Sequence, residues 1–232
     1  MMDQFLWVIF PYLALAVFIG GHIFRYNYDQ FGWTAKSSEV LEKKKLRWGS
    51  LLFHWGILFV LAGHIMGILI PAGVYEAIGV SEYTYHYIAI AGGLPAGIAA
   101  ALGLAIFIYR RYTVKRVRRT SSIGDWAALF FLAVVMGSGL SATFANIDSH
   151  GFDYRTTIGP WFRGLFVLSP DASLMETVPL WFKIHITAAF GLFAAWPFTR
   201  LVHFFSIPLR YLRRSYIVYR KREPIGTSKK VS

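Results

Sequence analysis

Long runs of apolar residues, separated by short polar segments, dominate the pattern along the chain. Five such stretches lie at Phe5–Phe24, Gly49–Ile70, Tyr85–Tyr109, Ile123–Ala145 and Pro179–Phe205. Each has about 20 residues or more, the length that a helix needs to cross a hydrocarbon core of roughly 30 Å. Their residues are apolar around the whole helix rather than on one face. The pattern therefore predicts an all-α polytopic membrane protein with five transmembrane helices.

Two segments next to these spans need separate interpretation. The first span differs from a secretory signal peptide, because no basic segment precedes it and no small-residue cleavage site follows it. We expect it to stay in the protein as a span. The long Asn146–Val178 segment between the fourth and fifth spans contains two prolines and four acidic residues. We expect this segment to fold as a cap on the outer side.

Basic residues lie mainly on one side of the predicted spans. The segments after the first and third spans carry six each, and the chain from Arg200 onward carries nine, against three on the opposite side. Because loops rich in Lys and Arg stay in the cytoplasm, this partition predicts an outside N-terminus and a cytoplasmic C-terminus. Residues 1–208 are thus expected to form the membrane domain. Residues 209–232 are expected to form a basic cytoplasmic tail that either lies on anionic lipid headgroups or docks a partner.

Composition narrows the classes of function. With 56% hydrophobic and 16% charged residues, the chain is neither a disordered protein nor an ordinary soluble domain. It has no cysteine, which excludes disulfides, thiolate zinc sites, iron–sulfur clusters and covalently attached c-type haem. The net charge of +12 is typical of nucleic-acid binding, but the basic residues lie beside the spans and not on a soluble domain. Nucleic acid is therefore excluded as a partner.

Four of the seven histidines lie inside predicted spans, His54 and His64 in the second and His185 and His203 in the fifth. Ionisable residues in a membrane are costly, and they are candidates for functional sites. Along one helix the first two are about 15 Å apart and the last two about 27 Å apart, too far to hold one metal. Because these spans run in opposite directions, we expect His54 to face His203 near the cytoplasm and His64 to face His185 in the outer half.

Two histidine pairs stacked across a helical bundle suit two b-type haems. Imidazole is an axial haem ligand, and non-covalent haem needs no cysteine. The two histidines of the second span are about 80° apart around an ideal helix, so helix tilt or a wide cofactor is needed to absorb the offset. Pro197 predicts a kink in the fifth span. Gly56, Gly63 and Gly67 either let a macrocycle lie against the second span or allow close helix packing.

The other three histidines carry weaker signals. His22, near the inner end of the first span, is expected to cap a helix or to lie at the interface. His150 lies in the outer segment and is expected to be solvated. His86 opens the third span on the outer side, next to Glu82, and is either an interfacial residue or a group that exchanges protons with a quinol.

Six short stretches carry a resemblance to a known family: Arg25–Phe31 (RYNYDQF), Phe53–Leu58 (FHWGIL), Gly63–Gly67 (GHIMG), Val74–Ala77 (VYEA), Pro197–His203 (PFTRLVH) and Ser206–Leu209 (SIPL). In their order and spacing they resemble the membrane gamma subunit, the cytochrome b subunit, of respiratory nitrate reductase. The histidine spacings of ten and eighteen also match that family. The resemblance covers nearly the whole chain, including the frame of five spans.

This resemblance implies two haems b, the inner one bound by His54 and His203 and the outer one by His64 and His185. It implies that quinol is oxidised beside the outer haem and that its protons are released outside. Electrons would pass to the inner haem, then to an iron–sulfur beta subunit and to a molybdenum-bearing alpha subunit that reduces nitrate. Such proteins are multi-pass proteins of the prokaryotic cytoplasmic membrane. Three arginines lie where haem propionates could find a cation, although the orientation rule also explains them: Arg110, Arg111 and Arg200.

One position departs from the family pattern. Some members carry a lysine before the third span that assists quinol binding, and this chain has Thr84 there. Either a neighbouring residue takes over that role or the quinone pocket differs. Our hypothesis is that His86, with Gly63 and His64, lines the quinol site.

Two other functions stay open at this point. The first is a related di-haem cytochrome b that serves a heterodisulfide- or sulfite-reductase-linked complex, which the copurifying subunits would identify. The second is a transporter or receptor with incidental histidines, which would lack the visible bands of paired low-spin haems.

Overall fold

The computed structural model describes residues 1–29, 38–147 and 152–206. All regular structure in these residues is helical, which confirms the all-α prediction. The α-helices are α1 (Met2–Gln4), α2 (Phe10–Tyr28), α3 (Lys44–His64), α4 (Ala72–Ala77), α5 (Glu82–Thr113), α6 (Lys115–Arg119), α7 (Ile123–Ala145), α8 (Ile158–Phe166) and α9 (Leu180–Ala195). Two π-helical turns, η1 (Phe5–Ile9) and η2 (Ile65–Leu69), and three 3₁₀ segments, η3 (Ala172–Met175), η4 (Trp196–Phe198) and η5 (Arg200–Ser206), complete them. The expected tail, 209–232, lies outside the described residues.

Four continuous helical runs are long and apolar enough to cross a membrane, namely Met2–Tyr28, Lys44–Leu69, Glu82–Thr113 and Ile123–Ala145. They correspond to the first four predicted spans. Three of them extend a few residues beyond the apolar stretch, because helix hydrogen bonding continues into the flanking polar residues. α5, for example, runs on through Arg110 and Arg111 before it ends.

The fifth predicted stretch is helical but broken. α9 has 16 residues, after which the chain narrows to the 3₁₀ turn η4. Pro197 has no N–H to continue the α-helical ladder, and Thr199 is extended with φ −114° and ψ 175° before η5 begins. Arg25 of α2 donates to the Pro197 carbonyl at 2.7 Å, which supplies a partner for an acceptor at this broken end. The expected kink is therefore a full interruption of the helix.

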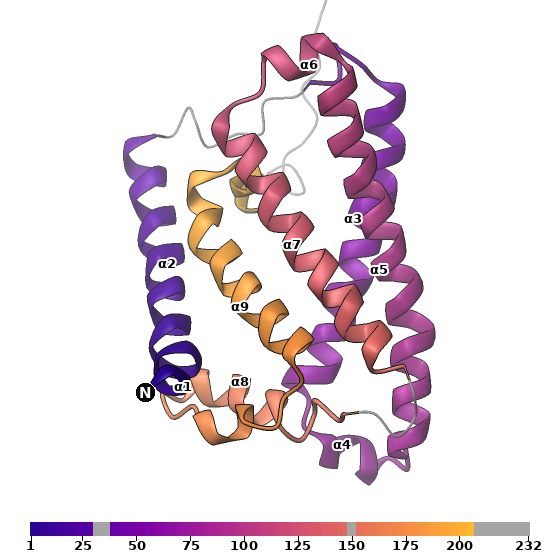
Figure 1. The fold of residues 1–232 in the computed structure, drawn as a ribbon, viewed down its shortest axis with the longest axis vertical. Coiled ribbons are helices and arrows are strands. Elements are labelled where there is room, and N and C mark those ends of the chain that lie inside the picture. The colour runs from indigo at the N-terminus through magenta and orange to yellow at the C-terminus, as the bar shows by residue number, and fades with distance from the viewer. Residues whose placement is uncertain (30–37, 148–151, 207–232) are drawn as a thin grey trace, which may run out of the picture.

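The helices form a bundle with two sides (Figure 1). α3 and α5 pack against each other along one side, α2 and α9 lie on the other, and α7 runs obliquely beside α9 toward α5. Small residues permit the close α3–α5 contact. A Cβ added at Gly56 would lie 2.5 Å from the Ala100 backbone nitrogen, and one at Gly103 would lie 2.4 Å from the Phe53 nitrogen. These two glycines thus set the distance between the two helices.

The described residues 152–179 fold against one end of the bundle, as expected of a cap. α8 lies across this end beside the N-terminus (Figure 1). Trp161 of α8 is fully buried, donates from Nε1 to the Trp7 carbonyl at 2.8 Å and meets the Trp7 ring edge-on. Met175 of η3 and Phe190 of α9 complete the same apolar cluster. We call this end the α8 end and the opposite one, which carries α6, the α6 end.

The packing of α3 on α5 predicts opposite outcomes for two glycine substitutions. Gly56→Ala is expected to destabilise the protein by about 1–3 kcal/mol, because its Cβ meets backbone that cannot move alone. Gly92→Ala, on a part of α5 with open space around it, is expected to be neutral or to gain up to about 1 kcal/mol from helix propensity. Thermal unfolding of the purified variants measures both. Equal stability of the two variants would contradict the packing account.

Candidate functional site

Two pairs of histidines face each other between α3 and the chain of α9 and η5; His54 and His64 are exposed, and His185 and His203 are half-buried. His54 of α3 and His203 of η5 have ring centroids 6.3 Å apart, toward the α6 end. His64 of α3 and His185 of α9 have centroids 5.9 Å apart, toward the α8 end. The structure thus brings together the residues that the spacing of the sequence paired. The tilt of α9 and its interruption after Ala195 accommodate their unequal spacings.

Each of the four rings is held in the same way, by a contact from Nδ1 to a backbone carbonyl oxygen. The acceptors are Ser50 for His54 (2.9 Å), Val60 for His64 (2.7 Å), Val135 for His185 (2.9 Å) and Arg200 for His203 (2.9 Å). A carbonyl oxygen only accepts, so Nδ1 carries the proton in each neutral ring. The lone pair is then on Nε2. This tautomer is the one that a metal-binding histidine adopts when its other nitrogen is fixed by a carbonyl.

The chemistry of this donor set fits haem better than a bare metal ion. The described residues contain no cluster of three or more His, Cys, Asp or Glu that would hold a metal by themselves. Two imidazoles with metal–nitrogen distances of about 2 Å have ring centroids about 6 Å apart across one metal atom, which matches both pairs. A porphyrin supplies the four remaining nitrogens of an octahedral iron. Each pair therefore has the ligands, the tautomer and the separation that one haem requires.

Glycines around the pairs fall into two groups. Beside Gly63, which is exposed, a Cβ would meet nothing within 4 Å. At Gly67, in contrast, a Cβ would lie 2.8 Å from the Tyr154 ring, and Gly56 is filled by α5. Of the two interpretations, helix and loop packing accounts for Gly56 and Gly67. Of these three glycines, Gly63 alone has no neighbouring atom where a Cβ would lie.

α7 contributes to the His185 site through residues that the sequence analysis did not select. Val135 accepts from His185 Nδ1, Ser138 Oγ lies 3.5 Å from the same nitrogen, and a Cβ on Gly139 would come within 2.9 Å of the imidazole. The small residues of the GSGLS stretch, 137–141, were a signal for this close approach.

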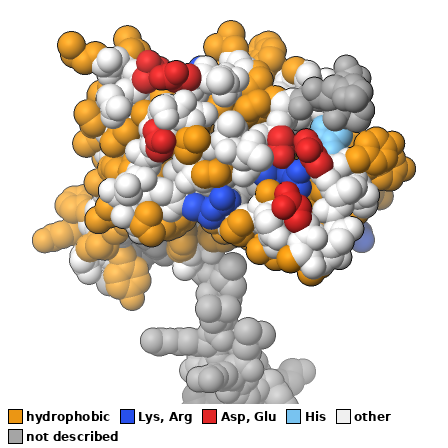
Figure 2. Space-filling model, turned by 90° about the horizontal axis from the view of Figure 1, so that it is seen from below, with side chains coloured by type: hydrophobic (Ala, Val, Ile, Leu, Met, Phe, Trp, Pro, Cys, Tyr) orange, Lys and Arg blue, Asp and Glu red, His pale blue; other side chains and the backbone are white. Residues whose placement is uncertain are grey.

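At the α8 end, charged and phenolic groups surround a recess. Figure 2 shows acidic and basic side chains with a histidine beside them, among hydrophobic groups. Arg155 is buried, binds both carboxylate oxygens of Asp153 at 3.0 Å and lies 4.3 Å above the Tyr85 ring. His86 is half-buried, with Nε2 3.4 Å from the Ile147 carbonyl. The recess is lined by Glu82, Tyr85, His86, Phe152, Asp153, Tyr154 and Arg155.

The pKa values of two side chains in this recess, Tyr154 and Arg155, are shifted by burial and by a neighbouring charge. Burial raises the pKa of the Tyr154 phenol, which therefore stays neutral across the physiological range. Burial opposes the charge on Arg155, but the paired Asp153 carboxylate outweighs this and raises the pKa of the guanidinium. Gly63 and His64, which we expected to share a site with His86, do not line the recess itself.

His22 shares the contact from Nδ1 to a carbonyl, but its ring lies against phenylalanines. His22 has Nδ1 2.6 Å from the Phe18 carbonyl of its own helix, and its ring lies against Phe18 and Phe205. His150 lies outside the described residues.

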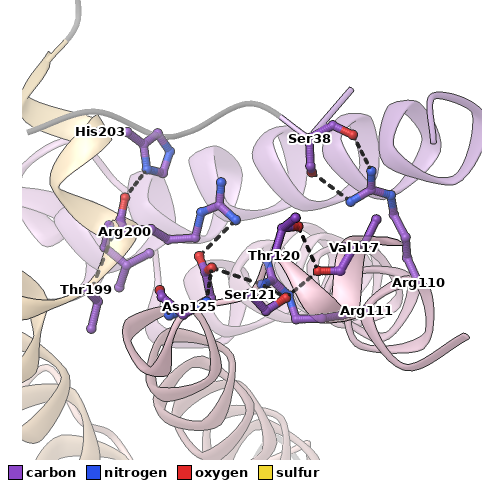
Figure 3. Close-up of polar contacts among 12 residues, drawn as sticks. Ser38, Arg110, Arg111, Val117, Thr120, Ser121, Asp125, Thr199, Arg200 and His203 are labelled. Atoms are coloured by element: carbon purple, nitrogen blue, oxygen red, sulfur yellow. Dashed lines mark hydrogen bonds and ion pairs between the residues drawn. The ribbon is translucent and has the colours of Figure 1, made fainter. Parts of the chain in front are cut away.

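The three arginines considered for haem propionates form ion pairs at the α6 end (Figure 3). Arg110 binds Glu42 Oε2 at 2.8 Å and also donates to Ser38, which fixes the segment before α3 to the end of α5. Arg111 and Arg200 share the carboxylate of Asp125, each at 3.1 Å. The position of these arginines beside the spans could be seen in the sequence, but their carboxylate partners, Glu42 and Asp125, could not.

The sequence of this chain matches a protein family model and is similar to several known proteins. The family model of the nitrate reductase gamma subunit matches residues 3–222. The nitrate reductase gamma chain of Bacillus subtilis is 64% identical over 96% of this chain and its own full length. The respiratory nitrate reductase 1 gamma chain of Escherichia coli is 34% identical over 95% of this chain and 98% of its own. An Hdr-like menaquinol oxidoreductase cytochrome b-like subunit of Archaeoglobus profundus is 26% identical over 68% of this chain and 46% of its own.

The Glu42–Arg110 pair predicts a pH-dependent contribution to stability. Burial disfavours the Glu42 carboxylate, but hydrogen bonds from the Lys45 and Leu46 amides and from Arg110 outweigh it and hold the Glu42 pKa below 4.5. Because the folded-state pKa is lowered, the stabilisation is present above the unfolded pKa and is lost as pH falls through the folded one. Glu42→Gln is expected to lower the melting temperature at pH 7 and to lose this effect in acid. A difference independent of pH would contradict the assignment.

Proposed function

The chain belongs to the nitrate reductase gamma subunit family, the membrane-anchored subunits of respiratory nitrate reductase, and on this premise we propose that it is a di-haem cytochrome b that oxidises quinol. In this proposal it takes electrons from quinol near its outer face. It delivers them to iron–sulfur and molybdenum subunits in the cytoplasm, where nitrate is reduced. The observation that carries the proposal is the two histidine pairs, each with Nδ1 bound to a carbonyl and Nε2 left to bind iron.

We propose five crossings of the prokaryotic cytoplasmic membrane, with the N-terminus outside. α9 with η4 and η5 makes the fifth, because residue 180 lies near the α8 end and His203 lies toward the α6 end. The N-terminus lies at the α8 end, opposite η5 (Figure 1). An odd number of crossings and the basic residues of α6 and its flanks support placing the α6 end in the cytoplasm.

In the proposed haem sites the protein supplies ligands, orientation and an apolar surrounding. His54 and His203 hold the inner haem, and His64 and His185 the outer one. Haem, when bound, supplies reversible one-electron transfer at iron. The carbonyls behind the four Nδ1 atoms fix the ring orientations and raise the basicity of Nε2, as the second shell of a metal ligand does.

Quinol oxidation releases protons as well as electrons, and we propose that the α8 end receives them. The imidazole of His86 opens to the recess at this end, so it can accept a proton and pass it outward. We place the quinol ring between this recess and Gly63, which precedes the proposed outer-haem ligand His64 and has no atom within 4 Å of its Cβ position. Tyr154, whose pKa is raised by burial, stays protonated and can donate a hydrogen bond there.

The partner subunits are proposed to bind at the α6 end. Four of the five residues of α6 are basic and exposed, at Lys115, Arg116, Arg118 and Arg119. Val117, the fifth, is buried and anchors the helix to the bundle. The alternative, a quinone-reactive subunit of a heterodisulfide-reductase-like complex, has the weaker support of the Archaeoglobus relative, and the subunits that copurify with the chain decide between the two.

Substitution of the histidines tests the haem proposal. His203→Ala and His64→Ala are each expected to remove or shift one low-spin haem signal, and not the same one, because each ring belongs to a different pair. Redox-titrated optical and EPR spectra of membranes that contain the variants measure this. The ligand assignment fails if neither substitution changes the spectra.

The role of His86 is tested separately. His86→Ala is expected to slow quinol oxidation by about a hundredfold or more, the lower end of the range for loss of a positioned proton acceptor, while both haem signals remain. Tyr83→Phe, three residues away and largely exposed, is the matched control and is expected to keep the wild-type rate. Unchanged quinol oxidation and inhibitor binding in His86→Ala would remove this residue from the quinol site.

A further inference from the structure

Three charged side chains at the α6 end tie together three separate parts of the chain. Asp125, in the first turn of α7, accepts from Arg111 of α5 through one carboxylate oxygen and from Arg200 of η5 through the other, both at 3.1 Å (Figure 3). Arg111 also donates to Ser121 at 2.6 Å. The carboxylate of Asp125 is thus the common link between two long helices and a short 3₁₀ segment.

This cluster is largely removed from solvent. The side chains of Arg111 and Asp125 are 9% and 15% exposed, and that of Arg200 is 30% exposed. Two guanidinium groups share one carboxylate, so the cluster keeps a net charge of +1. If the carboxylate were lost, two like charges would face each other with little water to screen them, and removing one partner of a buried pair is strongly destabilising.

Arg200 connects the cluster to the inner histidine pair. Its guanidinium binds Asp125, while its backbone carbonyl is the acceptor for His203 Nδ1 at 2.9 Å. The same residue is therefore anchored to α7 by its side chain and orients His203 by its main chain. No continuous helix supports this segment from α9, because the chain is extended at Thr199. η5 is instead held by the packing of its Leu201 against Ala128 and Leu192 and by the ion pair of Arg200.

We propose that Asp125 is a positioning residue for His203 and that its negative charge holds the midpoint potential of the inner haem below the value it would otherwise have. This inference rests on the proposed haem ligation by His54 and His203. Asp125 acts through Arg200 and does not touch the ligand itself. Loss of the carboxylate lets η5 shift and leaves an extra positive charge close to the inner site. Positive charge nearby favours the reduced form of the iron, so the potential rises.

Asp125→Asn is the direct test, measured in the membrane-bound complex by redox titration and EPR. An asparagine keeps an oxygen that can accept from the Ser122 amide at the start of α7, so the variant removes the charge and spares the helix cap. We expect the inner-haem signal to move to a more positive potential with an altered EPR position, or to be lost. The outer-haem signal is expected to stay unchanged, and Asp125→Glu is expected to restore the inner one.

Glu42→Gln is the matched control, because it removes the carboxylate partner of the neighbouring Arg110 at the same end of the bundle without touching η5. It is expected to leave both haem signals in place. An unchanged inner haem in Asp125→Asn, equal changes in both haems, or the same change in Glu42→Gln would overturn the inference.

Two further results keep the inference separate from the proposal on which it rests. If Asp125→Asn does not accumulate, Arg200→Gln breaks the same link from η5 and is expected to alter the EPR position of the inner haem alone; no change there contradicts the inference. If the wild type lacks an inner haem, or His203→Ala leaves it intact, the haem proposal itself fails, independently of Asp125.

Discussion

Each of the four paired histidines has its Nδ1 bound to a backbone carbonyl, and the proposed haem sites depend on that contact. In the apolar core of a membrane, a polar nitrogen without a hydrogen-bond partner is costly. The bond therefore fixes both the tautomer and the ring direction, so that Nε2 remains free to bind a metal. His54, His64 and His203 find the acceptor within the preceding turn of their own segment, whereas His185 takes it from Val135 of α7. The outer pair consequently needs three helices in place, and the close approach at Gly139 is part of that arrangement.

The two ends of the bundle manage charge differently. At the α8 end, the Arg155–Asp153 pair lies in a recess that His86 also lines, with Arg155 over the ring of Tyr85. At the α6 end, carboxylates hold arginines against the ends of α5 and η5, while the charges of α6 remain exposed. The first arrangement is suited to proton exchange and the second to a rigid support for a ligand and a charged face for partners. This difference agrees with the direction of electron transfer that we propose.

Much of this organisation could be predicted from sequence because it depends on periodicity and register. Apolar length gave four helices nearly to their ends, and the spacing of the histidines gave the pairs that the structure places side by side. Pro197 predicted a kink in the fifth helix, but the helix is fully interrupted. The reason is that Thr199, which follows, is extended, and its conformation depends on tertiary contacts. The partners Glu42 and Asp125 were missed because they lie far along the chain from Arg110 and Arg200, and a charge count does not reveal pairing. Val135 was missed because a carbonyl acceptor has no residue signature.

The central claim is that two histidine pairs bind two haems in one chain. The most direct measurement is the ratio of haem b to protein in the purified chain, by pyridine haemochromogen absorbance against amino-acid analysis, together with the EPR spectrum of the oxidised protein. The account predicts two haems per chain, both low-spin with two nitrogen ligands. A ratio of one or zero, or a high-spin signal for either haem, would contradict it.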